Sequence, residues 1–329
     1  MAKKNNQKLK ALCLVDILKK YTDEDHGLTM PEILEKLEAR GISAERKSIY
    51  EDFDLLRTYG FDIGSFHRNG YRYNLQSRDF DIAELKMLVD AVQSSKFITP
   101  NKTRLLVEKI SHLASDYQAK ELQRNIKVAN QIKSENERIL YTVDTIHAAI
   151  NSDSAITFNY FEWTPRGKKV AKHNGELYYT SPWALIWDDE YYYLAAYEEK
   201  SGLIKHFRVD KMQNASITGK KRNGYKVFRE NLKSEDYSRK FFGMYHGEEE
   251  YVTLRCDDSL AGVIYDRFGK GVAVTLTDEG FFDVSVSIKV SNIFFGWVTN
   301  FGNKIKITAP QNVVDNYRKH IESITEIYK

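Results

Sequence analysis

Three side chains near the middle of the chain have types and spacing that suit the binding of an anion. His206 and Arg208 lie two positions apart in one apolar run, and Tyr193 lies in the aromatic run Tyr191–Tyr197. Because strand side chains alternate between two faces, His206 and Arg208 should share the face opposite Phe207. Arginine forks onto phosphate or carboxylate, and tyrosine offers a ring and a donor. The pattern therefore predicts a sheet surface that binds an anionic ligand, which could be aromatic.

The elements that position these side chains are predicted to be three short strands. Apolar or aromatic runs alternate here with polar turns, which is typical of an antiparallel meander. The runs and the turns between them are Trp183–Trp187, Asp188–Glu190, Tyr191–Tyr197, Glu198–Gly202 and Leu203–Val209. An ordinary sheet is the alternative, with Arg208 paired to Asp210 or to the acidic turn. The three adjacent acids of that turn suggest a metal less readily than a solvated turn, so we expect no metal ion.

Several residues of the meander form a pattern of their own. They are Pro182, Leu185, Tyr192-Tyr193-Leu194, Phe207-Arg208, Asp210 and Lys211-Met212. This pattern resembles the signature of WYL domains, in which Pro precedes Trp-Tyr-Leu and then Arg-x-Asp-Arg-Ile. Tyr192 stands in place of Trp, and Lys211 in place of the second Arg, where it cannot fork onto a phosphate as Arg does.

The resemblance implies a small Sm-like β-barrel over residues 141–222. About five short strands in roughly 70 residues also suit a small barrel. The first strand, Ile156–Tyr160, would bring Tyr160 to the pocket face. We therefore expect an effector site made of Tyr160, Tyr193, His206 and Arg208, with a weaker part for Lys211, and relatives suggest a nucleotide or single-stranded nucleic acid as the effector.

The N-terminal residues 1–77 are predicted to form a winged helix-turn-helix. Helices are expected over Leu9–Tyr21, after the capping box that begins at Thr29, and over Ala44–Tyr59, with Ser43 as its cap. Two alternating runs then flank Arg68-Asn69-Gly70, a strong hairpin signal. Three helices followed by a hairpin are the order of a winged helix.

Basic and polar residues of the third helix and the wing are candidates for contact with double-stranded DNA. The candidates are Arg46, Lys47, Ser48, Tyr50, Arg68 and Arg72. A solvated helix face is the alternative, because any exposed helix carries charges. Residues 1–77 hold 13 Lys and Arg against 12 Asp and Glu, so DNA binding would depend on where the charges lie and not on their sum. The stretch from Glu45 to Asp52 is similar to the recognition helix of DeoR-like regulators, although Glu51 replaces their second Arg.

The remaining segments are a connector, a linker and a second α+β unit. Residues 78–140 are expected to be a connector that is helical throughout Arg78–Ile139, and we expect part of it to pair two copies in a homodimer. Residues 223–248 are predicted to be a linker. Residues 249–329 show the order β-α-β-β-α-β of a ferredoxin-like unit. Trp297-Val298, Phe301-Gly302 and Pro310 are similar to the extension that often follows WYL domains, so the fold class expected is multi-domain α+β.

Composition narrows the class of protein. Of 329 residues, 42% are hydrophobic and 29% charged, which indicates folded domains rather than disorder. No apolar run reaches the ~18 residues of a membrane span, and the start Met1–Lys10 does not resemble a signal peptide. Cys13 and Cys256 match no metal or redox spacing. No phosphate loop or dinucleotide fingerprint is present, so we expect no cofactor and a cytoplasmic protein.

The resemblance covers nearly the whole chain, and the order of its modules implies a bacterial transcriptional regulator that binds DNA and responds to an effector. Two other functions stay open. One is an enzyme acting on nucleotides, with His206 as a base, although no nucleophile or acid partner can be named. The other is an adaptor that binds protein through its helices and C-terminal unit. We expect no catalysis.

Overall fold

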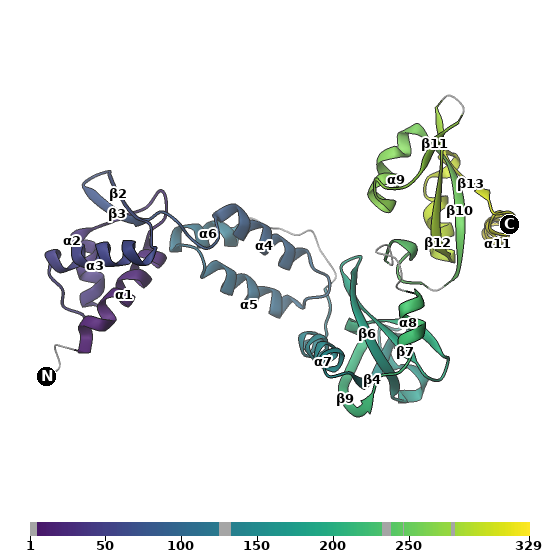
Figure 1. The fold of residues 1–329 in the computed structure, drawn as a ribbon, viewed down its shortest axis with the longest axis horizontal. Helices are drawn as coiled ribbons and strands as arrows, with labels where there is room; N and C mark the ends of the chain where they lie inside the picture. The colour runs from purple at the N-terminus through teal and green to yellow at the C-terminus, as the bar shows by residue number, and fades with distance from the viewer. Residues whose placement is uncertain (1–4, 125–132, 232–237, 246, 278–279) are drawn as a thin grey trace. The chain divides into compact units, whose positions relative to one another are not determined.

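A computed structural model describes residues 5–124, 133–231, 238–245, 247–277 and 280–329 (Figure 1). The chain divides into two compact units, Met1–Glu137 and Arg138–Lys329. The multi-domain α+β class expected from the sequence is confirmed. Within the described ranges, no helix has both the length and the apolar character needed to cross a membrane.

The first unit begins with a winged helix. Its elements follow in the order α1 Asn5–Tyr21, β1 Leu28–Thr29, α2 Met30–Glu38, α3 Arg46–Tyr59, β2 Ile63–His67 and β3 Tyr71–Leu75. The strands form an antiparallel sheet in the order β1-β3-β2. Ile33, Leu37, Ile49 and Phe53 are almost fully buried in the core beneath it. The predicted winged helix is confirmed.

Local signals explain where these helices begin and end. Thr29 accepts a hydrogen bond from the Glu32 backbone N–H, and the Glu32 carboxylate accepts one from the Thr29 N–H, which completes the predicted capping box. Gly60 ends α3 in the left-handed conformation, with φ 117°. The prediction that Ser43 caps α3 is wrong. Helix α3 begins at Arg46, so Glu45 is the cap residue, and Ser43 lies two residues before it, outside the cap position.

The connector of the first unit contains α4 Ile82–Ser94, α5 Pro100–Ser111 and α6 Asp116–Arg124. The capping box predicted at Asp81 and the helix start at Pro100 are confirmed. The prediction of helix up to residue 139 is wrong for residues 133–138, which are not helical. Residues 125–132 lie outside the described part. Lys133 Nζ donates to the Ser95 carbonyl at 2.9 Å, which holds this stretch in a non-helical path.

The second unit begins with a helix and a strongly bent sheet. The elements are α7 Ile139–Asn151, β4 Ser154–Trp163, β5 Lys169–Ala171, β6 Tyr178–Asp188, β7 Tyr191–Glu198, β8 Leu203–Arg208 and β9 Met212–Lys221. The strand order is β5-β4-β6-β7-β8, and β9 returns to pair with β4. A single 3-10 turn, Val209–Lys211, redirects the chain from β8 into β9. The sheet therefore curls into a half-barrel, and α7 packs against β4, β6 and β9.

A short helix, α8 Tyr225–Asn231, and a 3-10 turn, Ser238–Lys240, lie between the half-barrel and the C-terminal elements. Those elements are β10 Glu248–Asp257, α9 Ala261–Phe268, β11 Val274–Leu276, β12 Phe281–Val290, α10 Asn292–Thr299, β13 Ile305–Ala309 and α11 Gln311–Ile327. The sheet is antiparallel in the order β11-β12-β10-β13. This is the ferredoxin-like order expected from the sequence, with α11 added at its end.

Candidate effector face and nucleic-acid interface

Strands β7 and β8 bring Tyr193, His206 and Arg208 to one face of the half-barrel. Tyr193 lies opposite Arg208 in the antiparallel register, and Ala195 lies opposite His206. The intervening residue Phe207 points to the other face and is 5% exposed. Side chains along β8 therefore alternate between the two faces of the sheet, as expected from the sequence.

The Arg208 side chain is held by two neighbours. Its Nε and Nη2 atoms donate to the two Asp210 carboxylate oxygens at 3.1 and 2.8 Å, and its guanidinium lies 3.6 Å from the centre of the Tyr191 ring. Burial works against the charged form, yet the bonds to Asp210 raise the pKa of Arg208 above its ordinary value. The pairing with Asp210 is the alternative that the sequence left open. An anion at this site would meet a guanidinium that is already oriented, and would compete with Asp210 for it.

Tyr160 has a different position from the one expected. Its hydroxyl accepts a hydrogen bond from the Arg208 backbone N–H at 3.2 Å. Its ring packs edge-on against Phe158, Tyr178 and Phe207, on the core side of the sheet. Burial raises the pKa of the Tyr160 hydroxyl. Tyr160 therefore supports the backbone of Arg208 from the core side.

Lys211 lies in the 3-10 turn that follows β8, close to the charged pair. Burial, followed by the positive charge of Arg208, lowers the pKa of its ammonium group. Both effects arise from its place beside the guanidinium. Lys211 is therefore near the face, as a half-buried second cation.

The face also contains residues that sequence reasoning missed. Phe241 and Met244 form a buried cluster with Tyr193, against which Ile186 and Tyr191 pack. The Phe241 ring lies edge-on to the His206 ring, with 4.7 Å between centroids. Burial raises the pKa of Tyr193 to about 12. The pair Phe241-Phe242 stands out in the sequence as apolar, but its partner surface lies more than 30 residues away, so no local signal points to it.

The candidates for DNA contact on α3 differ in whether their side chains are bonded to neighbouring residues. Arg46 donates from Nε and Nη2 to the Tyr50 hydroxyl at 3.1 and 3.0 Å, and this hydroxyl also lies 3.0 Å from the Tyr73 hydroxyl. Burial and the contact with Tyr50 raise the pKa of Tyr73 to about 12. Lys47 is exposed. Tyr50 thus links the first turn of α3 to the wing strand β3.

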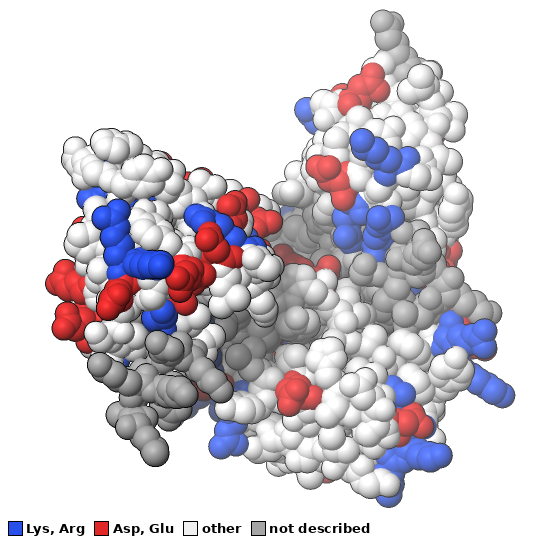
Figure 2. Space-filling view, turned by 60° about the vertical axis from the view of Figure 1, so that its left-hand side comes forward, with Lys and Arg blue, Asp and Glu red and all other residues white. Residues whose placement is uncertain are grey.

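Two other candidates hold the winged helix together. The Ser48 hydroxyl accepts a hydrogen bond from Lys10 Nζ at 3.0 Å, across the contact between α1 and α3. Arg72 donates to the Gly27 carbonyl at 2.7 Å and to the Arg68 carbonyl at 3.0 Å, while the Arg68 side chain is exposed. Figure 2 shows Lys and Arg interspersed with Asp and Glu on the face of this unit in view. Contact with DNA would therefore depend on the placement of a few cations.

Comparison with known families identifies the second unit. Residues 141–217 match the WYL domain, and residues 248–325 match the WCX domain. The chain contains a WYL domain followed by a WCX domain. The half-barrel with Arg208 is thus the WYL domain, and the ferredoxin-like unit is the WCX domain.

Two solved structures are similar to the chain at low identity. The first is the proteasome accessory factor B/C (PafBC) of Arthrobacter aurescens, with 16% identity, a TM-score of 0.29 and coverage of 97% of this chain. This chain spans about half of that protein, 49% of its length. The second is a CRISPR Cas-related protein, with 13% identity, a TM-score of 0.38 and coverage of 75% of this chain and 71% of the other. No curated protein matches the chain.

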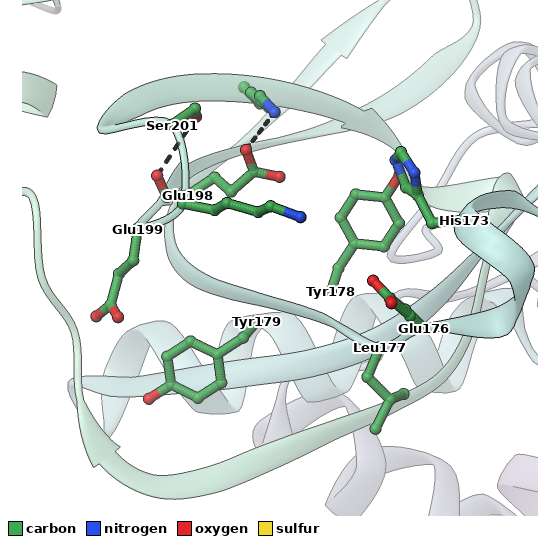
Figure 3. A pocket seen from close by; sticks show the side chains of 10 residues that line it. His173, Glu176, Leu177, Tyr178, Tyr179, Glu198, Glu199 and Ser201 are labelled. Atoms are coloured by element: carbon green, nitrogen blue, oxygen red, sulfur yellow. Dashed lines mark hydrogen bonds and ion pairs between the residues drawn. The ribbon is translucent and has the colours of Figure 1, made fainter.

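A separate cavity of about 570 Å³ lies in the WYL domain, beside the turn between β7 and β8. Figure 3 shows Glu198 and Ser201 at its wall. The Glu198 carboxylate contacts Lys205, and the Ser201 hydroxyl donates to the Glu198 carbonyl at 3.4 Å. The cavity has both acidic and basic side chains in its lining. It is lined by His173, Glu176, Leu177, Tyr178, Tyr179, Glu198, Glu199, Lys200, Ser201 and Lys205. The residues of the Arg208 face are not among them, so this cavity is distinct from the predicted effector face.

The acidic turn of the WYL domain lies between β6 and β7. Asp189 and Glu190 connect β6 to β7 with φ angles of 45° and 64°, which is the backbone geometry of a tight hairpin turn. Over the described part of the chain, no group of three or more His, Cys, Asp or Glu side chains is placed to hold a metal ion. Asp189 and Glu190 are therefore the central residues of a tight turn between two strands.

Proposed function

We propose that the chain is a sequence-specific DNA-binding transcriptional regulator whose WYL domain senses an anionic effector. The observation that carries the proposal is that one chain contains two separate cation sites. The winged helix presents Arg46 and Lys47 at the first turn of α3. The WYL domain holds Arg208 between an aromatic ring and a carboxylate.

In the DNA-binding step, the N-terminal end of α3 enters the major groove, as second helices of this motif do. Lys47 contacts a base edge or a phosphate, and Arg46 reaches the duplex from beside Tyr50. Arg68 on the wing contacts the flanking phosphates. Ser48 and Arg72 support this surface through their bonds to Lys10 and Gly27. The mixed charge of this unit favours a small contact face over broad electrostatic binding.

In the sensing step, an anionic group replaces the Asp210 carboxylate on the guanidinium of Arg208. The Tyr191 ring, which already lies against the guanidinium, offers a stacking surface for a base. Tyr193, which is 8% exposed and packs with Phe241, would offer a second one when uncovered. A nucleotide or a single strand of nucleic acid supplies both a phosphate and a base. Arginine suits this exchange because its planar fork matches phosphate geometry.

The two steps are coupled in a homodimer assembled partly through the connector helices α4 to α6. The effector shifts the placement of the two winged helices only if it binds the two arrangements of the dimer with different affinity. We propose that the protein acts without catalysis in the cytoplasm. The ring of His206, the one base suggested by the sequence, packs against Phe241.

Fluorescence anisotropy tests the proposal directly. A labelled duplex from upstream of the protein's own gene is titrated with the full chain at a stated salt concentration, because such affinities fall steeply with salt. Binding at least ~10³-fold tighter than to a scrambled duplex supports a specific regulator. Equal affinity for both duplexes, together with no preferred sites in a genomic pull-down, would rule out sequence-specific regulation.

A further inference from the structure

Two adjacent phenylalanines between the WYL and WCX domains are buried in different cores. Phe241, 2% exposed, packs with Tyr193 and Met244 on the effector face of the WYL domain. Phe242, 4% exposed, belongs to the WCX core, where its ring lies 5.3 Å from both Phe294 and Trp297. Consecutive Cα atoms are 3.8 Å apart, so one short stretch of backbone is anchored in both cores.

Arg267 on α9 of the WCX domain fixes this pair. Its Nη2 atom donates to the Phe241 carbonyl at 2.5 Å, and its guanidinium lies 4.3 Å from the centre of the Phe242 ring. Burial lowers the pKa of Arg267, while the nearby charge of Asp188 in the WYL domain raises it. A half-buried cation of the WCX domain therefore holds the residue that covers the WYL face.

A second contact secures the same segment. Lys240, one residue before Phe241, forms an ion pair with Glu249 on β10 at 2.5 Å. Hydrogen bonding to Lys240 lowers the pKa of Glu249 to about 2, so the carboxylate is charged at neutral pH. Both flanks of Phe241 are thus fastened to the WCX domain, whereas its ring is buried against the WYL domain.

We propose that Phe241 and Met244 act as a plug that occupies the effector face until an anionic ligand displaces it. This inference rests on the proposed sensing function of the WYL face. A base that stacks on Tyr193 needs the space beside His206 that the Phe241 ring fills. The ligand therefore competes with Phe241. Its binding pulls on Phe242 and Arg267, and so transmits occupancy of the WYL domain to the WCX domain.

The plug makes a prediction opposite to that of a simple binding wall. If only a fraction of molecules has the face uncovered, the apparent dissociation constant is the intrinsic one divided by that fraction. Removing the plug should thus tighten binding. If Phe241 instead were a wall on which the base stacks, its removal would weaken binding by the loss of that stacking.

The test measures binding of a fluorescein-labelled twelve-residue oligothymidylate, and of AMP by competition, to the full chain. Phe241→Ala is compared with Tyr245→Ala, an exposed aromatic of the same segment. Arg267→Met, which cannot donate to the Phe241 carbonyl and leaves the residues of the WYL face unchanged, serves as the second variant should Phe241→Ala fold poorly. Circular dichroism and thermal unfolding establish the fold of each variant.

We expect Phe241→Ala and Arg267→Met to bind at least one probe about 10-fold more tightly, with Tyr245→Ala unchanged. Hydrogen exchange of residues 239–245 in the native chain should speed up when the probe is added, although ligands usually slow exchange near their site. Weaker binding by Phe241→Ala overturns the plug and indicates a wall. Failure of every folded variant to bind either probe also overturns it, while duplex binding by the winged helix, measured separately, decides the regulator proposal.

Discussion

The winged helix and the WYL domain hold their candidate cations in different ways. On α3, Lys47 is exposed, and the exposed Arg46 donates to the Tyr50 hydroxyl, with the ring of Tyr50 at 5.6 Å. In the WYL domain, the Arg208 side chain is 28% exposed and has both a carboxylate and an aromatic ring against its guanidinium. The cations of α3 are thus open to solvent, whereas Arg208 is oriented before any ligand arrives.

This difference fits the two kinds of partner that we propose. A duplex is a large polyanion, and its binding gains from counterion release by surface cations that need no enclosure. A small effector offers few contacts, so its recognition depends on a pre-oriented donor in a partly desolvated place. The exposed cations suit rapid sampling of sequence, whereas the enclosed arginine suits discrimination of one ligand from others.

The largest expected effects separate the two regions as folding units. Phe53 in the winged helix and Phe158 in the WYL domain are fully buried aromatics, so changing either to Ala should cost about 3–5 kcal/mol of unfolding free energy. Phe53→Ala should abolish duplex binding and spare effector binding, and Phe158→Ala should do the reverse. Urea unfolding with both binding assays checks this. Leu55→Ala, at a position 60% exposed, is the control and should stay within about 0.5 kcal/mol.

The next effect concerns the enclosed arginine. Arg208→Ala should weaken effector binding by about 10- to 100-fold, because a charged hydrogen bond contributes roughly 1.5–3 kcal/mol. Arg208→Lys should not restore it, since an ammonium group cannot form the planar fork. Isothermal titration with a nucleotide measures both variants, and duplex affinity without effector serves as the control. Full rescue by Lys would mean that only a point charge is read.

The exposed lysine should behave in the opposite way. Lys47→Ala should weaken duplex binding by roughly 1–3 kcal/mol if it reads a base, or reduce the salt slope by about 1 if it contacts a phosphate. Effector affinity should not change. Anisotropy at several salt concentrations separates the two contacts. Lys120→Ala on α6 is also exposed, removes the same charge outside the winged helix and should leave duplex affinity unchanged.

The smallest effect is a pH dependence of the winged helix. Burial alone would raise the pKa of Glu32, but hydrogen bonds from Thr29 and the charges of Arg72 and Lys36 lower it below its ordinary 4.5. A carboxylate with a lowered pKa stabilises the fold above pH 4.5, and this contribution is lost as the pH falls through the folded-state value. Glu32→Gln should therefore cost about 1 kcal/mol or less at pH 7, since partial exposure screens the charges, and the difference should shrink in acid.

Thermal unfolding between pH 7 and pH 3 measures this difference. Glu38→Gln, at the exposed end of the same helix, is the control and should differ from the native chain by less than about 0.5 kcal/mol throughout. A Glu32→Gln difference that grows as the pH falls would show that the carboxylate acts by something other than its charge.

Much of the local structure could be predicted because its causes are local. The capping boxes at Thr29 and Asp81, the turn at Asn69-Gly70 and the stop at Gly60 depend on residues a few positions apart. The order of strands and helices in residues 249–329 likewise pointed to the ferredoxin-like sheet. Where the rule failed, at Ser43, the helix began two residues later than its capping signal suggested.

The sequence by itself determined which residues alternate along β8, and so which side of the sheet His206 and Arg208 share. Only the tertiary structure decided what meets that side. In the folded chain, the Tyr160 hydroxyl accepts a hydrogen bond from the Arg208 backbone, Arg72 donates to the Gly27 carbonyl, and Phe241 packs against Tyr193. The physical reason is range: strand alternation and helix caps follow from neighbouring residues, whereas these contacts join segments that only the folding of the whole unit brings together.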